Sequence, residues 1–208
     1  MSRSRTPERI AEMALALFNE HGEPNITTNR IADELDISPG NLHYHFRTKQ
    51  ALIDDLFGRF EQRMFALLHA GAPERADIED VWLYLHLVFE TIAEYRFVYR
   101  DLNELSSRSR DLARRIRAIL KLSMQTADDL LAALQRGKEL AIDADNRAAL
   151  VRNIVLVSSY WIAFEQVLTP KRVPDPGTAA WQVMSLVSPY LRGDAGEQFR
   201  RLADAYRA

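Results

Sequence analysis

Apolar residues recur every three to four positions along most of the chain, which is the spacing of one face of an α-helix. The first run begins after Thr6-Pro7-Glu8, a pattern typical of a helix start, and ends at Gly22. Its apolar face is formed by Ile10, Ala14, Leu17 and Phe18. Glycine and proline, eight of each, fall mainly between such runs. The pattern predicts an all-α protein of about nine to ten helices.

Two short helices follow, joined by a very short turn. Thr27 or Thr28 can cap the first of them, and Ser38-Pro39 starts the second. Because only Asp36-Ile37 lies between them, the two helices cannot pack antiparallel and must cross steeply over a small core shared with the first helix. Residues 27–46 therefore form a helix-turn-helix pattern.

Longer helices are predicted for the rest of the chain. Thr48 caps a helix that runs through Ala70 and stops at Gly71-Ala72-Pro73. A break is predicted at 96–108 and a loop at 169–177, and the further helices are placed at 77–95, 109–135, 145–168, 178–191 and 196–206. We place a three-helix N-terminal domain at residues 1–47 and a second domain at 48–208, so that the helix after Thr48 couples the two mechanically.

Composition is that of a globular protein with an ample core, because 47% of the 208 residues are hydrophobic and 27% are charged. The chain has no cysteine, which excludes disulfides, thiol catalysis and Cys-ligated metal sites and suits a reducing cytoplasm. The N-terminus lacks the features of a signal peptide. The most apolar stretch, Ile154–Leu168, is shorter than a membrane span, and we expect a buried helix there. We therefore expect a cytoplasmic protein without a membrane partner.

The overall charge does not indicate a nucleic-acid-binding protein, since the chain has 27 basic and 29 acidic residues and a net charge of −2. Only local clusters of basic residues, such as Arg3 with Arg5, can do so, and those two arginines could enter a minor groove. A further stripe on one helix face consists of Arg110, Arg114, Arg117 and Lys121. This stripe is either a solvated face or a site for an anionic partner, such as flanking phosphates or an acyl-coenzyme A.

The second short helix carries an unusual outer face. With Leu42 and Phe46 facing the core, the helical wheel turns Gly40, Asn41, His43, Tyr44 and Arg47 outward. A merely solvated face would normally hold Glu, Lys and Gln. Asn and His can bond base edges, Tyr can donate to a phosphate, and a glycine lets the helix N-terminus approach the DNA backbone. The alternative is a small helical protein that has this periodicity and never binds DNA.

These same positions carry a resemblance to a known family. The TetR family of regulators is similar at Thr27-Thr28, Ile31-Ala32, Ile37-Ser38, Gly40-Asn41-Leu42, Tyr44-His45-Phe46 and Lys49, within residues 7–53. The resemblance implies a repressor that binds double-stranded DNA as a dimer, through Thr27 or Thr28, Ser38, Pro39, Gly40, Asn41, His43, Tyr44, His45 and Lys49. His43 stands where many members have tyrosine, which affects base preference. Shorter segments, including Gly22-Glu23-Pro24-Asn25, resemble a subgroup that regulates polyhydroxyalkanoate gene clusters.

The second domain is expected to hold a small apolar effector. Asp80 to Tyr95 is apolar almost all round, so we expect other helices to sheathe it. Within it, His86 and Glu90 share a face, either as a buried hydrogen-bonded pair or as a polar anchor in a ligand pocket. The candidate pocket residues are Trp82, Tyr84, His86, Glu90, Tyr99, Asn103, Ser123 and Trp161.

Helices 145–168 and 178–191 carry surplus apolar surface. The resemblance implies that these two helices form a four-helix bundle with a second subunit, giving a homodimer. The alternative is that they are core helices of a monomer.

Recognisable catalytic motifs are absent from the chain: it has no G-x-G-x-x-G, P-loop, H-E-x-x-H or G-x-S-x-G pattern. His43 and His45 point in different directions on a helix and cannot chelate one metal ion. We therefore expect no enzyme, cofactor or metal. The expected function is a ligand-responsive, sequence-specific DNA-binding transcriptional regulator that reads an inverted-repeat operator. The alternative is a dimeric helical small-molecule-binding protein that does not read DNA.

Overall fold

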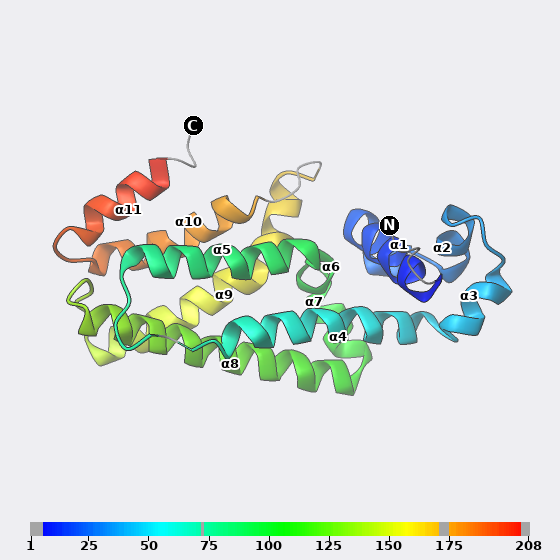
Figure 1. Cartoon of the computed structure of the whole chain (residues 1–208), viewed down its shortest axis with the longest axis horizontal. Helices are drawn as coiled ribbons and strands as arrows, with labels where there is room; N and C mark the ends of the chain where they lie inside the picture. The colour runs from blue at the N-terminus through cyan, green and yellow to red at the C-terminus, as the bar shows by residue number, and fades with distance from the viewer. Residues whose placement is uncertain (1–5, 72, 171–174, 205–208) are drawn as a thin grey trace.

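The computed structural model describes residues 6–71, 73–170 and 175–204, and these residues form an all-helical fold, as predicted (Figure 1). The helices are α1 (Thr6–His21), α2 (Thr28–Glu34), α3 (Pro39–His45), α4 (Lys49–Leu68), α5 (Ile78–Glu94), α6 (Arg96–Arg100), α7 (Leu102–Arg108), α8 (Arg110–Arg136), α9 (Ala144–Leu168), α10 (Pro176–Val187) and α11 (Ala195–Asp204), with short 3-10 turns η1 (Glu23–Asn25) and η2 (Ser188–Tyr190).

The N-terminal end of the molecule is a small unit made by α1, α2 and α3. Its core is completely buried at Ile10, Ala14, Phe18, Ile31 and Leu42. Figure 1 shows this unit at one end of the molecule, with α4 running from α3 into the remaining helices. There α8 packs on α4 and α9, while α10 packs on α5 and α9. Helix α4 contacts α1 of the N-terminal unit as well as α5 and α8, and so connects the two parts.

The predicted break at 96–108 is instead two short helices, α6 and α7. Tyr95 (φ −111°, ψ 38°) and Asp101 (φ −103°, ψ 23°) interrupt the helical path without unwinding it. Neither a glycine nor a proline marks these two kinks, and tertiary contacts override the local sequence there. The structure consequently has eleven α-helices within the described residues, against the nine to ten predicted.

Other boundaries differ by a few residues. Helix α9 begins at Ala144, and α10 ends at Val187, where η2 takes over. The last predicted helix, 196–206, corresponds to α11 as far as Asp204, and its final residues lie outside the described residues, as do Arg3 and Arg5.

Helix α5 is not sheathed on all sides, contrary to the expectation for residues 80–95. Leu83 is 62% exposed, and Leu87 on the next turn is exposed as well. The reason is that α4, α6, α10 and α11 pack against one side of α5 and leave this strip of the helix facing outward. Apolar composition alone does not tell which side of a helix is covered.

Within the single chain, helix α9 is buried on one side and carries exposed apolar residues on the other. Its inward residues are Leu150, Val151, Ile154, Ser159 and Ile162. Its exposed apolar residues are Leu156, Tyr160, Phe164, Val167 and Leu168. By length and composition alone α9 could cross a membrane, with 33% of its most apolar window buried, but core helices of other proteins share that composition.

Candidate nucleic-acid interface and internal cavity

The angle between α2 and α3 is fixed by side-chain caps and a tight turn. The Thr27 hydroxyl oxygen accepts the backbone N–H of Arg30 at 3.2 Å, and the Ser38 hydroxyl oxygen accepts that of Asn41 at 3.2 Å. Between them Asp36 adopts a left-handed conformation (φ 53°). These local bonds hold the two helices in the helix-turn-helix arrangement that the sequence predicts.

The outer face of α3 presents the side chains that the helical wheel turns outward. Leu42 is completely buried, whereas Asn41, His43 and Tyr44 are exposed, together with Pro39 and Gly40. Tyr44 is 83% exposed and its ring meets the half-buried His45 ring edge-on, with centroids 5.1 Å apart. An aromatic ring left in solvent on a rigid helix suits contact with a partner.

The two capping hydroxyls remain able to contact a ligand. Thr27 and Ser38 are both exposed, and each hydroxyl oxygen accepts one backbone N–H. Such a hydroxyl still has its own proton to donate, and phosphate oxygens are acceptors. Thr28, the first residue of α2, is half-buried, so it presents less of its side chain than Thr27 does.

Lys49 differs from the other candidates, because its ammonium group is held by Glu23. The Lys49 Nζ donates to the Glu23 carbonyl oxygen at 2.6 Å and lies 2.8 Å from Glu23 Oε1. It also lies 5.7 Å from the centre of the Phe18 ring. The side chain is 25% exposed. The contact between this ammonium and DNA that the resemblance implies therefore competes with an intramolecular ion pair.

The N-terminal unit is attached to the second domain at the end of α1. The carbonyl oxygen of Asn19 accepts from Arg96 Nε at 3.2 Å and from Arg100 Nη1 at 3.1 Å, and Arg100 also donates to the carbonyl of Phe18. The buried Asn19 amide donates to the carbonyl of Glu94 at 2.7 Å and accepts the N–H of Phe97 at 3.0 Å. Cations from α6 thus bind backbone carbonyls at the C-terminal end of α1, where the helix dipole favours positive charge.

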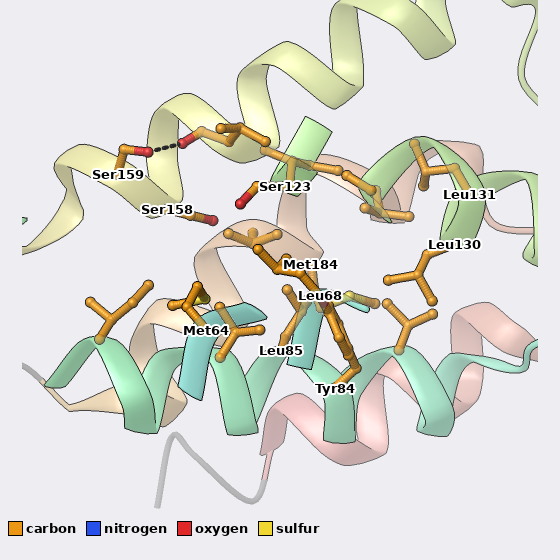
Figure 2. A pocket seen from close by; sticks show the side chains of 18 of the residues that line it. Met64, Leu68, Tyr84, Leu85, Ser123, Leu130, Leu131, Ser158, Ser159 and Met184 are labelled. Atoms are coloured by element: carbon orange, nitrogen blue, oxygen red, sulfur yellow. Dashed lines mark hydrogen bonds between the residues drawn. The ribbon is translucent and has the colours of Figure 1, made fainter. Parts of the chain in front are cut away.

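The second domain encloses a cavity (Figure 2). Counted together with its mouth, the cavity holds about 680 Å³ of free space. The centre of a water molecule fits in only about 70 Å³ of that space, so the cavity is narrow. Its lining comes from α4, α5, α6, α8, α9 and α10, and consists of Met64, Leu68, Val81, Tyr84, Leu85, Val88, Ile92, Tyr99, Ser123, Ala127, Leu130, Leu131, Ile154, Val155, Ser158, Ser159, Val183, Met184 and Val187. No described lining residue is charged.

A few hydroxyl groups interrupt this apolar lining. In Figure 2, Ser158 and Ser159 of α9 lie opposite Tyr84 of α5, and the Ser159 hydroxyl donates to its own helix, to the Val155 carbonyl at 2.7 Å. The Tyr84 hydroxyl is buried without a hydrogen-bond partner among the described residues. Burial raises the pKa of Tyr84 to about 12, and it also raises the pKa of Tyr99. Both phenols therefore stay neutral donors.

The structure brings Tyr84, Tyr99 and Ser123 to the cavity, and it places the other candidates elsewhere. Trp82 packs against Phe199 of α11, with ring centroids 6.2 Å apart, and against the half-buried His86. Glu90 is exposed, so it forms neither a buried pair with His86 nor an anchor in the cavity. Trp82, His86 and Glu90 share one strip of α5, whereas the cavity lies beside the strip at 81, 84, 85, 88 and 92.

The two remaining candidates also lie outside the cavity lining. Exposed Asn103 accepts a hydrogen bond from the Tyr160 hydroxyl at 3.3 Å, and half-buried Trp161 packs near Phe164, with ring centroids 6.1 Å apart. Sequence reasoning missed most lining residues because apolar residues spaced three and four apart are also the signal of an ordinary core. It also missed the buried polar residues Asn19 and Glu23, for which no local pattern gives a signal.

Two family models match the chain. One, described as "Bacterial regulatory proteins, tetR family", matches residues 10–56, and the other, a TetR model described as "Bacterial transcriptional repressor", matches residues 59–199. Together they span both parts of the fold.

Among solved structures, a TetR-family transcriptional regulator from Marinobacter aquaeolei VT8 is 32% identical, with a TM-score of 0.87 over 99% of this chain and 100% of that chain. KstR2 of Mycobacterium tuberculosis is 20% identical, with a TM-score of 0.66 over 93% and 98%, which shows similarity of fold alone.

Curated relatives match over shorter stretches. The class A tetracycline repressor protein from transposon 1721 of Escherichia coli is 37% identical over 76 residues, which cover 36% of this chain and 32% of that protein. The repressor KstR2 of Rhodococcus jostii is 29% identical over 126 residues, covering 50% and 59%. The chain therefore spans less than two thirds of either protein.

Proposed function

Since the chain belongs to the TetR family of bacterial transcriptional regulators, we propose that it is a cytoplasmic repressor that binds an inverted-repeat operator as a homodimer and responds to a small effector. A regulator, rather than an enzyme, is the function proposed. The observation that carries the proposal is the outer face of α3, where Asn41, His43 and Tyr44 stand exposed on a helix whose start is capped by Ser38.

The proposed contacts with DNA follow from the chemistry of each group. Asn41 and His43 reach base edges in the major groove, where amide and imidazole groups can bond them. Tyr44 contacts a phosphate or a thymine methyl group. Gly40 and Pro39 let the start of α3 approach the backbone, and the hydroxyls of Ser38 and of Thr27 or Thr28 donate to phosphates. His45 and Lys49 lie beside this surface and contribute less in the conformation described.

The homodimer is proposed to form through the exposed face of α9. Leu156, Tyr160, Phe164 and Leu168 are spaced four residues apart and therefore form one apolar stripe along the helix. No large apolar residue described on α10 is fully exposed, so α9 supplies the greater part of the interface. A symmetric pair places two α3 helices on DNA, and these read successive major grooves when they lie roughly 34 Å apart.

The effector is proposed to bind in the cavity as an uncharged, mostly apolar molecule. The lining holds no charged side chain, and a buried ionised group without a partner is costly. Met64 and Met184 have flexible side chains that can move to widen so narrow a space. An acyl chain suits this lining, whereas the phosphates of coenzyme A would have to lie outside it.

A matched ligand series tests this effector chemistry. A fatty acid, its methyl ester and the corresponding alcohol, all of one chain length, are compared by thermal shift on the full chain. The ester and the alcohol should raise the melting temperature more than the carboxylate does, because only the carboxylate brings a charge into the cavity. Equal stabilisation by all three would contradict an uncharged site.

The test of the proposed function is selection of bound sequences from random duplex DNA with the purified chain at moderate salt. Enrichment of an inverted repeat is the expected result. Binding that selects no sequence and vanishes as the salt concentration rises would mean non-specific charge attraction only. That outcome would favour the alternative of a dimeric helical ligand-binding protein that does not read DNA.

A further inference from the structure

One carboxylate is fully buried where the N-terminal unit meets the second domain. Glu23 lies in η1, between α1 and α2, and is 0% exposed. It follows Gly22, whose left-handed conformation (φ 90°) turns the chain directly after α1. A Cβ atom at Gly22 would lie 3.4 Å from Arg100 Nη2, so the connection passes close against the second domain. An ionised group in such a place requires strong partners.

Two cations from different parts of the chain bind this carboxylate. Lys49 Nζ, at the start of α4, lies 2.8 Å from Glu23 Oε1. Arg108, the last residue of α7, donates from Nη1 to Oε1 at 3.3 Å and from Nη2 to Oε2. Burial alone would raise the pKa of Glu23, but the hydrogen bonds from Arg108 and Lys49 outweigh burial and lower it below its usual value. The carboxylate is therefore charged, and both cations face it.

The backbone of Glu23 is held as firmly as its side chain. Its N–H donates to Asp101 Oδ2 at 3.0 Å, and its carbonyl accepts from Lys49 at 2.6 Å. Asp101 and Arg108 stand immediately before α7 and at its end. Helix α7 thus contacts Glu23 at two points, and a shift of α7 relative to α1 would break a charged contact.

The same short segment also reaches the cavity. Tyr99 lines the cavity, and Asp101 follows it by two residues. Arg100, between them, donates to the carbonyls of Phe18 and Asn19 at the end of α1. A change of cavity shape that moves Tyr99 therefore also moves the two residues after it, Arg100 and Asp101, which are hydrogen-bonded to the N-terminal unit.

We propose that Glu23 is a positioning residue: its ion pair with Arg108 fixes the orientation of the N-terminal unit on the second domain and thereby sets the spacing between the two α3 helices of the dimer. The inference rests on the proposed function as a dimeric operator-binding regulator. Lys49 stabilises the charged carboxylate on the side of the N-terminal unit, and Arg108 provides the connection that can be made or lost independently.

The variant Arg108→Met tests the proposal, because it removes the charge and the donors, keeps an apolar stem, and leaves the Lys49–Glu23 pair in place. Binding is measured to the selected operator, to operators with one base pair added or removed between the half-sites, and to a duplex with a single half-site. One base pair changes both the distance and the rotation between half-sites, so a rigid dimer prefers one spacing.

The wild-type chain should strongly prefer the selected spacing, and Arg108→Met should reduce this preference by about fivefold or more. Single half-site affinity should stay within about twofold, because the α3 surface is unchanged. Arg201→Met is the matched control, since Arg201 is an exposed arginine of α11 paired only with Glu197 among the described residues, and it should leave the preference unchanged. Arg108→Lys retains the charge and should keep part of the preference for the selected spacing. If Arg108→Met fails to fold, the lysine variant provides the test in its place.

Two results would overturn the inference. An unchanged spacing preference in a folded Arg108→Met chain would show that the ion pair does not set the spacing. An equal loss of affinity for the full operator and the single half-site would show that Arg108 acts on DNA contact or on the fold of the N-terminal unit. If the wild-type chain selects no inverted repeat, the proposed function itself fails and the inference with it, and that result is separate from the first two.

Discussion

The outer face of α3 and the internal cavity are two candidate binding regions of opposite construction. The α3 face belongs to a helix of seven residues, it is exposed, and a side-chain cap fixes its start. The cavity draws its lining from six helices, and its walls are apolar apart from a few hydroxyl groups. The chemistry of the α3 face is set by which residues point outward on one short helix. The chemistry of the cavity is set by how helices far apart in the sequence pack together.

That difference has a consequence for function. A surface on a rigid helix can discriminate between closely related partners, because its groups are held in place before binding. A narrow, apolar cavity with two methionines adapts its shape and selects mainly by polarity and size. We therefore expect high sequence specificity for DNA and broader tolerance among effectors of similar polarity.

The largest effect is expected when a charge is placed on the exposed face of α9. Phe164→Glu should raise the dissociation constant of the dimer by about 100-fold or more, because a buried unpaired carboxylate opposes association. Sedimentation equilibrium measures this change, and operator affinity should fall with it. Leu83→Glu is the matched control on α5, where an exposed apolar residue lies outside the proposed interface. Dimers of equal strength in both variants would place the interface elsewhere.

The next effect concerns the contact that joins the two regions. Glu23→Gln should lower the free energy of unfolding by about 2–3 kcal/mol at neutral pH. This loss is small for a broken buried ion pair, because the cations left behind, Lys49 and Arg108, both reach solvent.

The pH dependence of this effect has a definite sign. The pKa of Glu23 is lowered from its usual value of 4.5 in the folded chain, so its stabilising contribution is present above that value and is lost as the pH falls through the lowered pKa. Urea unfolding of the wild type and Glu23→Gln should therefore converge in acid. A difference that is constant with pH would mean that the carboxylate charge contributes nothing.

Two matched alanine-to-leucine substitutions compare how tightly the core of the N-terminal unit and the cavity are packed. Ala14 is completely buried in the core of the N-terminal unit, whereas Ala127 lines the cavity. Ala14→Leu should destabilise the chain by about 1–3 kcal/mol through overpacking. Ala127→Leu should cost less, since free space accepts part of the new side chain, and it should also weaken binding of the ester probe. Equal losses of stability in urea would show that the cavity is packed as tightly as the core.

The smallest expected change is on the α3 surface itself. Tyr44→Ala should weaken operator binding by about tenfold, which is the loss of one good contact, and it should leave the melting temperature and the dimer unchanged because the ring is 83% exposed. Electrophoretic shift measures the affinity. His43→Ala should instead relax the base preference at one position of the selected site. If both variants bind the selected operator as the wild type does, α3 is not the reading helix.

Local sequence was sufficient for α2 and α3, the two short helices of the N-terminal unit. Thr27 and Ser38 form the predicted caps, Leu42 faces the core, and Asn41, His43 and Tyr44 stand outward. Each of these features depends on residues within a few positions of one another, so helical periodicity and capping chemistry predict them. The all-helical class and the long helices followed from the same rule.

Only the tertiary structure decided which side of each helix faces a neighbour. Apolar positions on α5 and α9 do not show that Leu83 is exposed, that Trp82 and His86 turn away from the cavity, or that Tyr84 turns toward it. The kinks at Tyr95 and Asp101 and the burial of Glu23 between Lys49 and Arg108 depend on contacts between residues far apart in the chain. Local sequence determines the helices and the surface of a short one, whereas a cavity and a buried ion pair arise only when distant segments meet.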